Sequence, residues 1–272
     1  METYFFVPGN RLHKIRDIQN LNITEIIIDL EDSVKESERK SILHKIILDF
    51  ELREFYVRVP LYDNKDFLNP FYFKELYKNG FRKFIFPKIQ KLQDFKTIIS
   101  EDTYKELQII LLIETSRFFL EVKEVLLEYR NILSGIGMGS HDFMAEIGGV
   151  HDLKNLEYVR HQILYLSRMI KIKAIDIASM EVANSSVLED EILDGVHKGY
   201  DAKFFIHPWQ LSVFKSISLY SDQEIRWALN IQNEFKKVIS EEEFNPIIVE
   251  GQIVERPHLD KAKKILKYYE SK

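Results

Sequence analysis

Eight short apolar runs, separated by longer charged stretches, are the feature of this sequence that most limits its fold. The runs are rich in β-branched and aromatic residues and almost continuous in apolar character, as in strands buried on both faces of a parallel sheet. They occupy residues 4–7, 25–30, 55–59, 83–87, 107–113, 132–138, 172–177 and 203–206. The stretch at 156–170 (LEYVRHQILYLSRMI), which separates two of the runs, has its apolar residues at helical spacing.

Eight strands with helices between them, in a chain of 272 residues, predict one closed (β/α)8 barrel of the TIM type. The alternative is an open doubly wound sheet. Such a sheet usually carries a GxGxxG turn after its first strand, and this chain has VPGNR at 7–11. We therefore expect residues 1–220 to form the barrel. Residues 221–272 would form a C-terminal helical arm or lid of the same domain, whose first helix begins with a capping box of Ser221 and Glu224.

Composition narrows the possible partners. The chain has no cysteine, which excludes disulfides, thiolate metal sites and cysteine nucleophiles. A net charge of −5 and a pI near 6.0 favour neither nucleic acid nor an anionic membrane as a partner. The apolar runs are too short to span a membrane, and the N-terminal residues do not resemble a signal peptide. We therefore expect a cytoplasmic protein.

Polar and charged residues gather where the predicted strands end, which is where barrels of this kind place their active sites. Taken singly, each could be a surface residue or an ion-pair partner, as Arg58 could be for Glu31 or Asp32. Their coincidence on one rim favours a functional site. In chain order they are Arg11, Asp29, Glu31, Asp32, Arg58, Lys88, Glu114, Asp142, Asp176 and His207.

Several carboxylates without cysteine favour Mg2+ over Zn2+, because Mg2+ prefers hard oxygen ligands. An arginine beside the ion can grip a substrate carboxylate with two parallel hydrogen bonds. Together these groups suit chemistry in which an enolate develops next to a metal.

The motifs at these positions resemble, in type and in order, those of the citrate lyase beta subunit family within the HpcH/HpaI aldolase group. They span nearly the whole chain, and their combination is far more specific than any one of them. They are FVPGNR at 6–11, DLEDSV at 29–34, VRVP at 57–60, PK at 87–88, IET at 113–115, GSHDF at 139–143, AID at 174–176 and IHPWQ at 206–210.

This resemblance implies a Mg2+-dependent carbon–carbon lyase that assembles as a trimer or hexamer. Relatives cleave citryl-, malyl- or citramalyl-CoA into an acyl-CoA and an oxo-acid. The substrate here would thus be a small oxo-acid or a CoA thioester. Mg2+ would be held by Glu114 and Asp142, with substrate oxygens completing its shell. Arg58 would bind the oxo-acid part.

The resemblance also implies roles for residues around the metal. Glu31 and Asp32 would orient waters or Lys88 and take part in catalysis. Substrate-binding residues on the CoA side would be Phe6, Arg11, His207 and Pro208.

One segment departs from the family pattern. Relatives carry G-x-x-I-D-x-P near the C-terminus, with an aspartate that usually serves a neighbouring subunit's site. Residues 251–257 read GQIVERP, so Glu255 takes that position and reaches one methylene further. A displacement of about 1 Å can lower a rate on the order of a hundredfold. Glu255 remains our candidate for the acid or base.

Two other functions stay open. A CoA-independent aldolase for free hydroxy-oxo acids is favoured by Glu255 and by the few basic residues near Arg11. A non-catalytic subunit of a larger complex would use the C-terminal arm for assembly, although such a subunit has no need of carboxylates on the barrel rim.

Overall fold

The computed structural model describes residues 1–100, 104, 106–236, 246–249 and 251–270. The chain forms two compact units, Met1–Phe214 and Lys215–Lys272. The smaller unit contains all of the predicted arm, residues 221–272. No helix among the described residues is long and apolar enough to cross a membrane.

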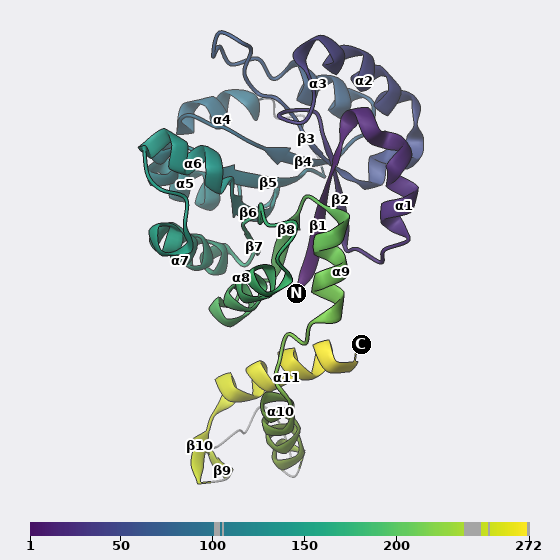
Figure 1. The fold of residues 1–272 in the computed structure, drawn as a ribbon. Coiled ribbons are helices and arrows are strands. Elements are labelled where there is room, and N and C mark those ends of the chain that lie inside the picture. Colours follow the sequence, from purple (N-terminus) through teal and green to yellow (C-terminus); the bar gives the residue numbers. More distant parts are fainter. Residues whose placement is uncertain (101–103, 105, 237–245, 250, 271–272) are drawn as a thin grey trace. The chain divides into compact units, whose positions relative to one another are not determined.

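The larger unit is a closed barrel of eight parallel strands that follow one another in chain order (Figure 1). β8 completes the closure by pairing with β1, with Thr3 opposite Lys203. The predicted (β/α)8 barrel is confirmed, and the open sheet is wrong. The strands are β1 (Glu2–Pro8), β2 (Glu25–Asp29), β3 (Tyr56–Arg58), β4 (Lys83–Phe86), β5 (Gln108–Ile113), β6 (Leu133–Met138), β7 (Lys173–Asp176) and β8 (Ala202–Phe205).

Helices surround the strands, as Figure 1 shows. The predicted amphipathic segment lies in α7, where Leu156 and Ile163 are fully buried and Asp152 caps the first turn. The helices of this unit are η1 (Gly9–Lys14), α1 (Ile15–Gln19), α2 (Glu36–Leu48), η2 (Phe50–Glu54), α3 (Phe71–Lys78), α4 (Leu92–Ile98), α5 (Ser116–Glu128), α6 (Ser140–Ile147), α7 (Leu153–Ile170), α8 (Ser185–Lys198) and α9 (Pro208–Ser216).

The strands are apolar throughout because both of their faces are buried. On β5, Ile110 and Leu112 belong to the cluster that fills the barrel, whereas Ile109 and Leu111, which alternate with them, are buried outside that cluster. The barrel interior also holds Tyr56 and Phe204. Since side chains fill the interior, a substrate site must lie at an end of the barrel.

The smaller unit contains α10 (Asp222–Phe235), the antiparallel hairpin of β9 (Ile247–Val249) and β10 (Gln252–Val254), and α11 (Arg256–Glu270). The predicted capping box is confirmed, because Glu224 N–H donates to Ser221 Oγ at 3.2 Å and Ser221 N–H donates to Glu224 Oε2 at 2.8 Å. The two helices and the hairpin share an apolar core of their own.

Candidate active site

A cavity of about 400 Å3 opens where the barrel strands end. Its lining includes several of the predicted site residues, together with Asp29, Ser140 and His141. The predicted residues that it brings together are Phe6, Asp32, Arg58, Glu114 and Asp142.

Arg58, at the end of β3, is oriented by a buried partner on the neighbouring strand. Asp29 lies opposite it in the register of β2 and β3. Arg58 Nε donates to Asp29 Oδ1 at 2.7 Å, and Nη2 donates to Oδ2 at 2.6 Å. Burial alone would raise the pKa of Asp29, but the hydrogen bonds and charge of Arg58 hold it below its ordinary value. The pair therefore stays ionised, and the guanidinium has a fixed direction.

The third nitrogen of Arg58 faces the two carboxylates that follow β2. Nη1 lies 3.5 Å from Glu31 Oε2 and 3.3 Å from Asp32 Oδ2. The predicted pairing with Glu31 and Asp32 is thus present, although Asp29 makes the stronger contact. The guanidinium also lies over the Phe6 ring, 5.0 Å from its centroid.

Lys88 contacts three carboxylates of the site, Glu31, Asp32 and Glu114. Its φ of +52° is unusual for a residue with a side chain and turns its N–H toward Glu114 Oε2, at 2.6 Å. Its Nζ lies 2.8 Å from Glu31 Oε1 and 2.5 Å from Asp32 Oδ1. One residue thus fixes the metal-ligand candidate through its backbone and the neighbouring carboxylates through its side chain.

Glu114 is buried at the end of β5, with 2% of its surface exposed. Burial and the negative charges of Glu31 and Asp142 raise the pKa of Glu114 to about 8, against the opposing charge of Arg58. A Cβ on Gly139 would collide with Glu114 Oε1, so only glycine lets Glu114 reach the start of α6, where Asp142 lies. A carboxylate this crowded by negative charge is well suited to receive a cation.

Glu31 is a second buried carboxylate with a raised pKa. Burial raises the pKa of Glu31 to about 7, while Arg58 and Lys88 act in the opposite direction. Among the described residues, its Oε2 has no hydrogen-bond partner. Glu31 and Lys88 line a separate, adjacent cavity that shares Asp32 with the first.

The remaining predicted residues lie elsewhere. Within the described part of the chain, the lining of the first cavity does not include Arg11, His207 or Pro208, although Ile206 belongs to it. Glu255 belongs to the smaller unit, where it is exposed and its N–H donates to His258 Nδ1 at 3.0 Å. These assignments therefore stay predictions.

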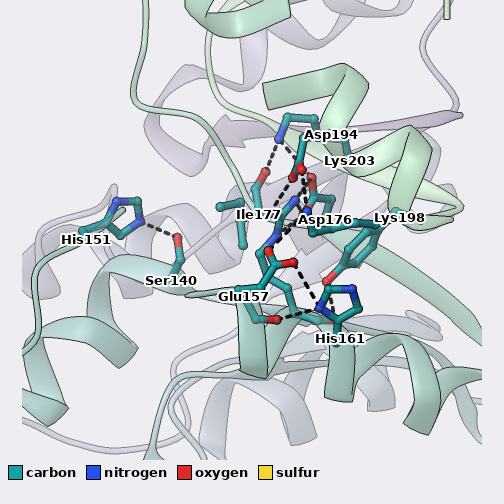
Figure 2. A network of polar contacts seen from close by, with 11 residues as sticks. Ser140, His151, Glu157, His161, Asp176, Ile177, Asp194, Lys198 and Lys203 are labelled. Carbon is teal, nitrogen blue, oxygen red and sulfur yellow. Dashed lines mark hydrogen bonds and ion pairs between the residues drawn. The ribbon is translucent and has the colours of Figure 1, made fainter. Parts of the chain in front are cut away.

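Asp176, which ends β7 as Asp29 ends β2, is fully buried in a network apart from the cavity lining (Figure 2). Its Oδ1 accepts hydrogen bonds from Arg160 Nε and Nη2 at 3.1 and 3.0 Å, and Lys203 Nζ lies 3.4 Å from its Oδ2.

Sequence reasoning did not single out Ser140, His141 and His151. The His141 and His151 rings stack at 3.7 Å with an interplanar angle of 8°. His151 Nε2 lies 2.9 Å from Ser140 Oγ, a contact drawn in Figure 2. Burial and the neighbouring His141 lower the pKa of His151. Because His151 follows α6, only the path of the chain after that helix brings it back to Ser140.

The chain is similar in sequence to a known protein family and to several of its characterised members. A family model described as HpcH/HpaI aldolase/citrate lyase matches residues 2–208. The mitochondrial citramalyl-CoA lyase of Homo sapiens is 24% identical over 257 residues, which cover 85% of this chain and 75% of that protein. Citrate lyase subunit beta of Leuconostoc mesenteroides subsp. cremoris is 24% identical over 280 residues, covering 97% and 92%.

A solved structure has the same fold over nearly its whole length. CitE from Mycobacterium tuberculosis, in complex with magnesium, acetoacetate and coenzyme A, superimposes with a TM-score of 0.79 at 20% identity. The match covers 98% of this chain and 97% of that one.

Proposed function

This chain belongs to the HpcH/HpaI aldolase/citrate lyase family, and we propose that it is a Mg2+-dependent carbon–carbon lyase acting on CoA thioesters. It would cleave or form a 3-hydroxyacyl-CoA, such as citryl-, malyl- or citramalyl-CoA, from an acyl-CoA and an oxo-acid. The observation that carries the proposal is one cavity lined by the Arg58 guanidinium and by the Glu114 and Asp142 carboxylates. The relatives named as citramalyl-CoA lyase and citrate lyase subunit beta support it.

Glu114 and Asp142 would hold the Mg2+. Their oxygen donors suit this ion, and the buried Glu114 needs a cation to ionise fully near neutral pH. The CitE complex with magnesium and coenzyme A supports this choice. When bound, Mg2+ polarises a carbonyl oxygen and neutralises the charge that develops on it.

The protein's own residues would bind and orient the substrate. Arg58 lines the cavity, and Asp29 engages its Nε and Nη2. Its Nη1, which lies 3.3 Å from Asp32 and 3.5 Å from Glu31, would bind the oxo-acid carboxylate. Asp32, paired with Lys88 and Arg58, would hold both cations in place. With Glu114 committed to the metal, Glu31, whose pKa is raised to about 7, would be the carboxylate best suited to hold a proton at neutral pH.

A CoA-independent aldolase is the second candidate. It is favoured because Arg11, His207 and Pro208, which were expected on the CoA side, are not part of the described cavity lining. Metal-dependent aldol activity on free oxo-acids, with no binding of coenzyme A, would select it. A cytoplasmic location and assembly as a homotrimer or hexamer belong to the same set of proposals.

The proposed function is tested by calorimetry with pyruvate, glyoxylate and oxaloacetate, in Mg2+ and in EDTA. We expect the wild type to bind at least one of them only with Mg2+, and Glu114→Ala to bind none. Glu124→Ala, an exposed change on the outer face of α5, is the control and should bind as the wild type does. Binding that persists in EDTA or in Glu114→Ala would refute the metal site, and cleavage of the three CoA thioesters would identify the substrate.

A further inference from the structure

Gln210, in the first turn of α9, is a fully buried side chain that uses its whole hydrogen-bonding capacity on backbone groups. Its Oε1 accepts from the N–H groups of Ile206 and His207, at 3.0 and 3.2 Å. Its Nε2 donates to the carbonyl oxygens of Ser179 and Glu181, at 2.9 and 3.0 Å. One amide therefore connects the segment after β7 to the segment after β8.

Buried side chains donate hydrogen bonds to the backbone carbonyl of every second residue in the segment after β7. Lys203 Nζ donates to the Ile177 carbonyl at 2.7 Å, close to its contact with Asp176 (Figure 2). The carbonyls of Ser179 and Glu181 are held by Gln210. The residues between them, Ala178 and Met180, line the cavity.

The segment after β8 contributes in the same way. Ile206 lines the cavity while its N–H is bound by Gln210. Gln210 thus fixes the two backbone segments that carry Ala178, Met180 and Ile206. We call these three side chains the apolar wall.

The cavity has a charged side and an apolar side. Its charged residues come from β2, β3, the segments after β2 and β5, and the first turn of α6. Among the described lining residues, β1, β8 and the segments after β7 and β8 contribute only apolar side chains. Strands β7, β8 and β1 are consecutive in the closed barrel, so the apolar residues form a continuous arc.

We propose that Gln210 is a positioning residue for the apolar wall, and that this wall selects an oxo-acid whose keto carbon carries a small alkyl group. The inference rests on the proposed function. An oxo-acid whose carboxylate and keto oxygen lie at the charged side directs its remaining substituent toward the apolar side. The methyl group of pyruvate gains apolar contact there, whereas the hydrogen of glyoxylate leaves a gap. The second carboxylate of oxaloacetate loses its hydration without gaining an ionic partner. The class selected is therefore that of pyruvate, over glyoxylate and oxaloacetate.

Calorimetry in Mg2+ with these three acids tests the selectivity. We expect the wild type to bind pyruvate about tenfold or more tighter than glyoxylate, the scale of one apolar carbon in a pocket. Gln210→Met removes all four hydrogen bonds at similar volume, and the ratio should fall toward one. Tyr200→Phe is the matched control, because it removes a buried hydrogen bond to the Arg160 carbonyl but does not line the cavity. It should leave the ratio unchanged.

Hydrogen exchange tests the positioning role without a substrate. The amides of Ile206 and His207 should exchange faster in Gln210→Met and not in Tyr200→Phe. Ile206→Ala changes the wall but keeps the backbone hydrogen bond to Gln210. It should lower the affinity ratio of pyruvate over glyoxylate while the two amides exchange at the wild-type rate. This variant tests the wall even if Gln210→Met does not fold.

The outcomes separate the claims. Unchanged exchange at both amides in a folded Gln210→Met would overturn the positioning role. An unchanged affinity ratio in both Gln210→Met and Ile206→Ala would overturn the selection by the wall. If the wild type bound no oxo-acid, the proposed function and the selectivity would fail together, and the exchange rates would still decide the role of Gln210.

Discussion

Among single residues, Arg58 divides its three guanidinium nitrogens between two tasks. Nε and Nη2 are held by Asp29, and Nη1 remains for Glu31, Asp32 and a substrate anion. A lysine has one nitrogen at the end of a flexible stem and cannot do both. The arginine is therefore needed for its shape as well as for its charge.

Arg58→Lys should lower turnover on the CoA thioester at least tenfold and reduce the free energy of unfolding by about 3 kcal/mol, because the buried Asp29 loses its two-point partner. Steady-state kinetics and urea denaturation measure the two effects. Arg168→Lys is the control, since Arg168 makes the same two-point contact with Asp201 at the surface. It should change stability by less than about 1 kcal/mol and leave turnover unchanged. Equal effects of the two substitutions would contradict the role of Arg58.

Gly139→Ala should weaken Mg2+ binding at least tenfold. Gly139 has an ordinary φ of −84°, so alanine is permitted by the backbone, and the three atoms nearest to the added Cβ all belong to Glu114. Titration calorimetry with Mg2+ measures the effect. Gly148→Ala, which has no neighbour within 4 Å but strains a left-handed position, serves as control and should keep its Mg2+ affinity. Unchanged Mg2+ binding in Gly139→Ala would mean that Glu114 is not a ligand.

Glu31 and Asp29 should affect the pH dependence of stability with opposite signs. The pKa of Glu31 rises to about 7 on folding, so the folded state holds the proton more tightly and its contribution is lost as pH rises between about 4.5 and 7. Glu31→Gln should therefore gain stability relative to the wild type over that range, by about 3 kcal/mol.

The pKa of Asp29 is lowered on folding, so its contribution is present at neutral pH and is lost on acidification. The deficit of Asp29→Asn should be greatest at neutral pH and shrink in acid. Urea denaturation at a series of pH values, without added metal, checks both variants. Differences that do not vary with pH would contradict the assigned pKa directions.

At the scale of the elements, helix ends connect the loops that carry the site. Thr115 caps α5 by accepting from Phe118 N–H at 3.3 Å, and its hydroxyl donates to the Ile89 carbonyl at 2.8 Å. Ile89 follows Lys88, whose backbone is held in the left-handed region. The start of α5 thus supports the loop after β4 and, through it, the Lys88 contact with Glu114.

Thr115→Val keeps the shape of the side chain and removes both hydrogen bonds. It should lower the free energy of unfolding by about 1–2 kcal/mol and weaken oxo-acid binding. Thr97→Val, which removes one exposed hydrogen bond to Gln93 within α4, should change stability by less than about 0.5 kcal/mol. Thermal denaturation and calorimetry compare the pair. A stability loss in Thr115→Val without any change in binding would restrict Thr115 to a capping role.

At the scale of the whole molecule, the chain divides into a barrel and a smaller unit with a separate apolar core. The hairpin of the smaller unit pairs Ile248 with Ile253, and these side chains are 77% and 68% exposed. Exposed apolar pairs of this kind often mark contacts between chains.

Light scattering of the purified protein should give the mass of a trimer or hexamer, and Ile253→Asp should lower that mass. A monomeric wild type would contradict the predicted assembly. If Ile253→Asp kept the mass of the wild type, the contact between chains would lie on another surface.

The barrel and its polar rim follow from the pattern of residues along the chain. Eight nearly continuous apolar runs are stable only as strands buried on both faces, and the ends of parallel strands meet at one edge. For that reason Arg58, Glu114 and Asp142 could be predicted to lie near one another, as the shared cavity confirms.

Which polar side chains share the cavity depends on how the chain folds. Asp29 and Asp176 are the last residues of β2 and β7, yet Asp29 lines the cavity with Arg58 and Asp176 binds Arg160 instead. Successive side chains on a strand point to opposite faces, so one position of register decides between these outcomes, and the sequence does not fix it to within a residue. The contacts of His151 with Ser140 and of Gln210 with the segment after β7 join residues that only the folded chain brings together.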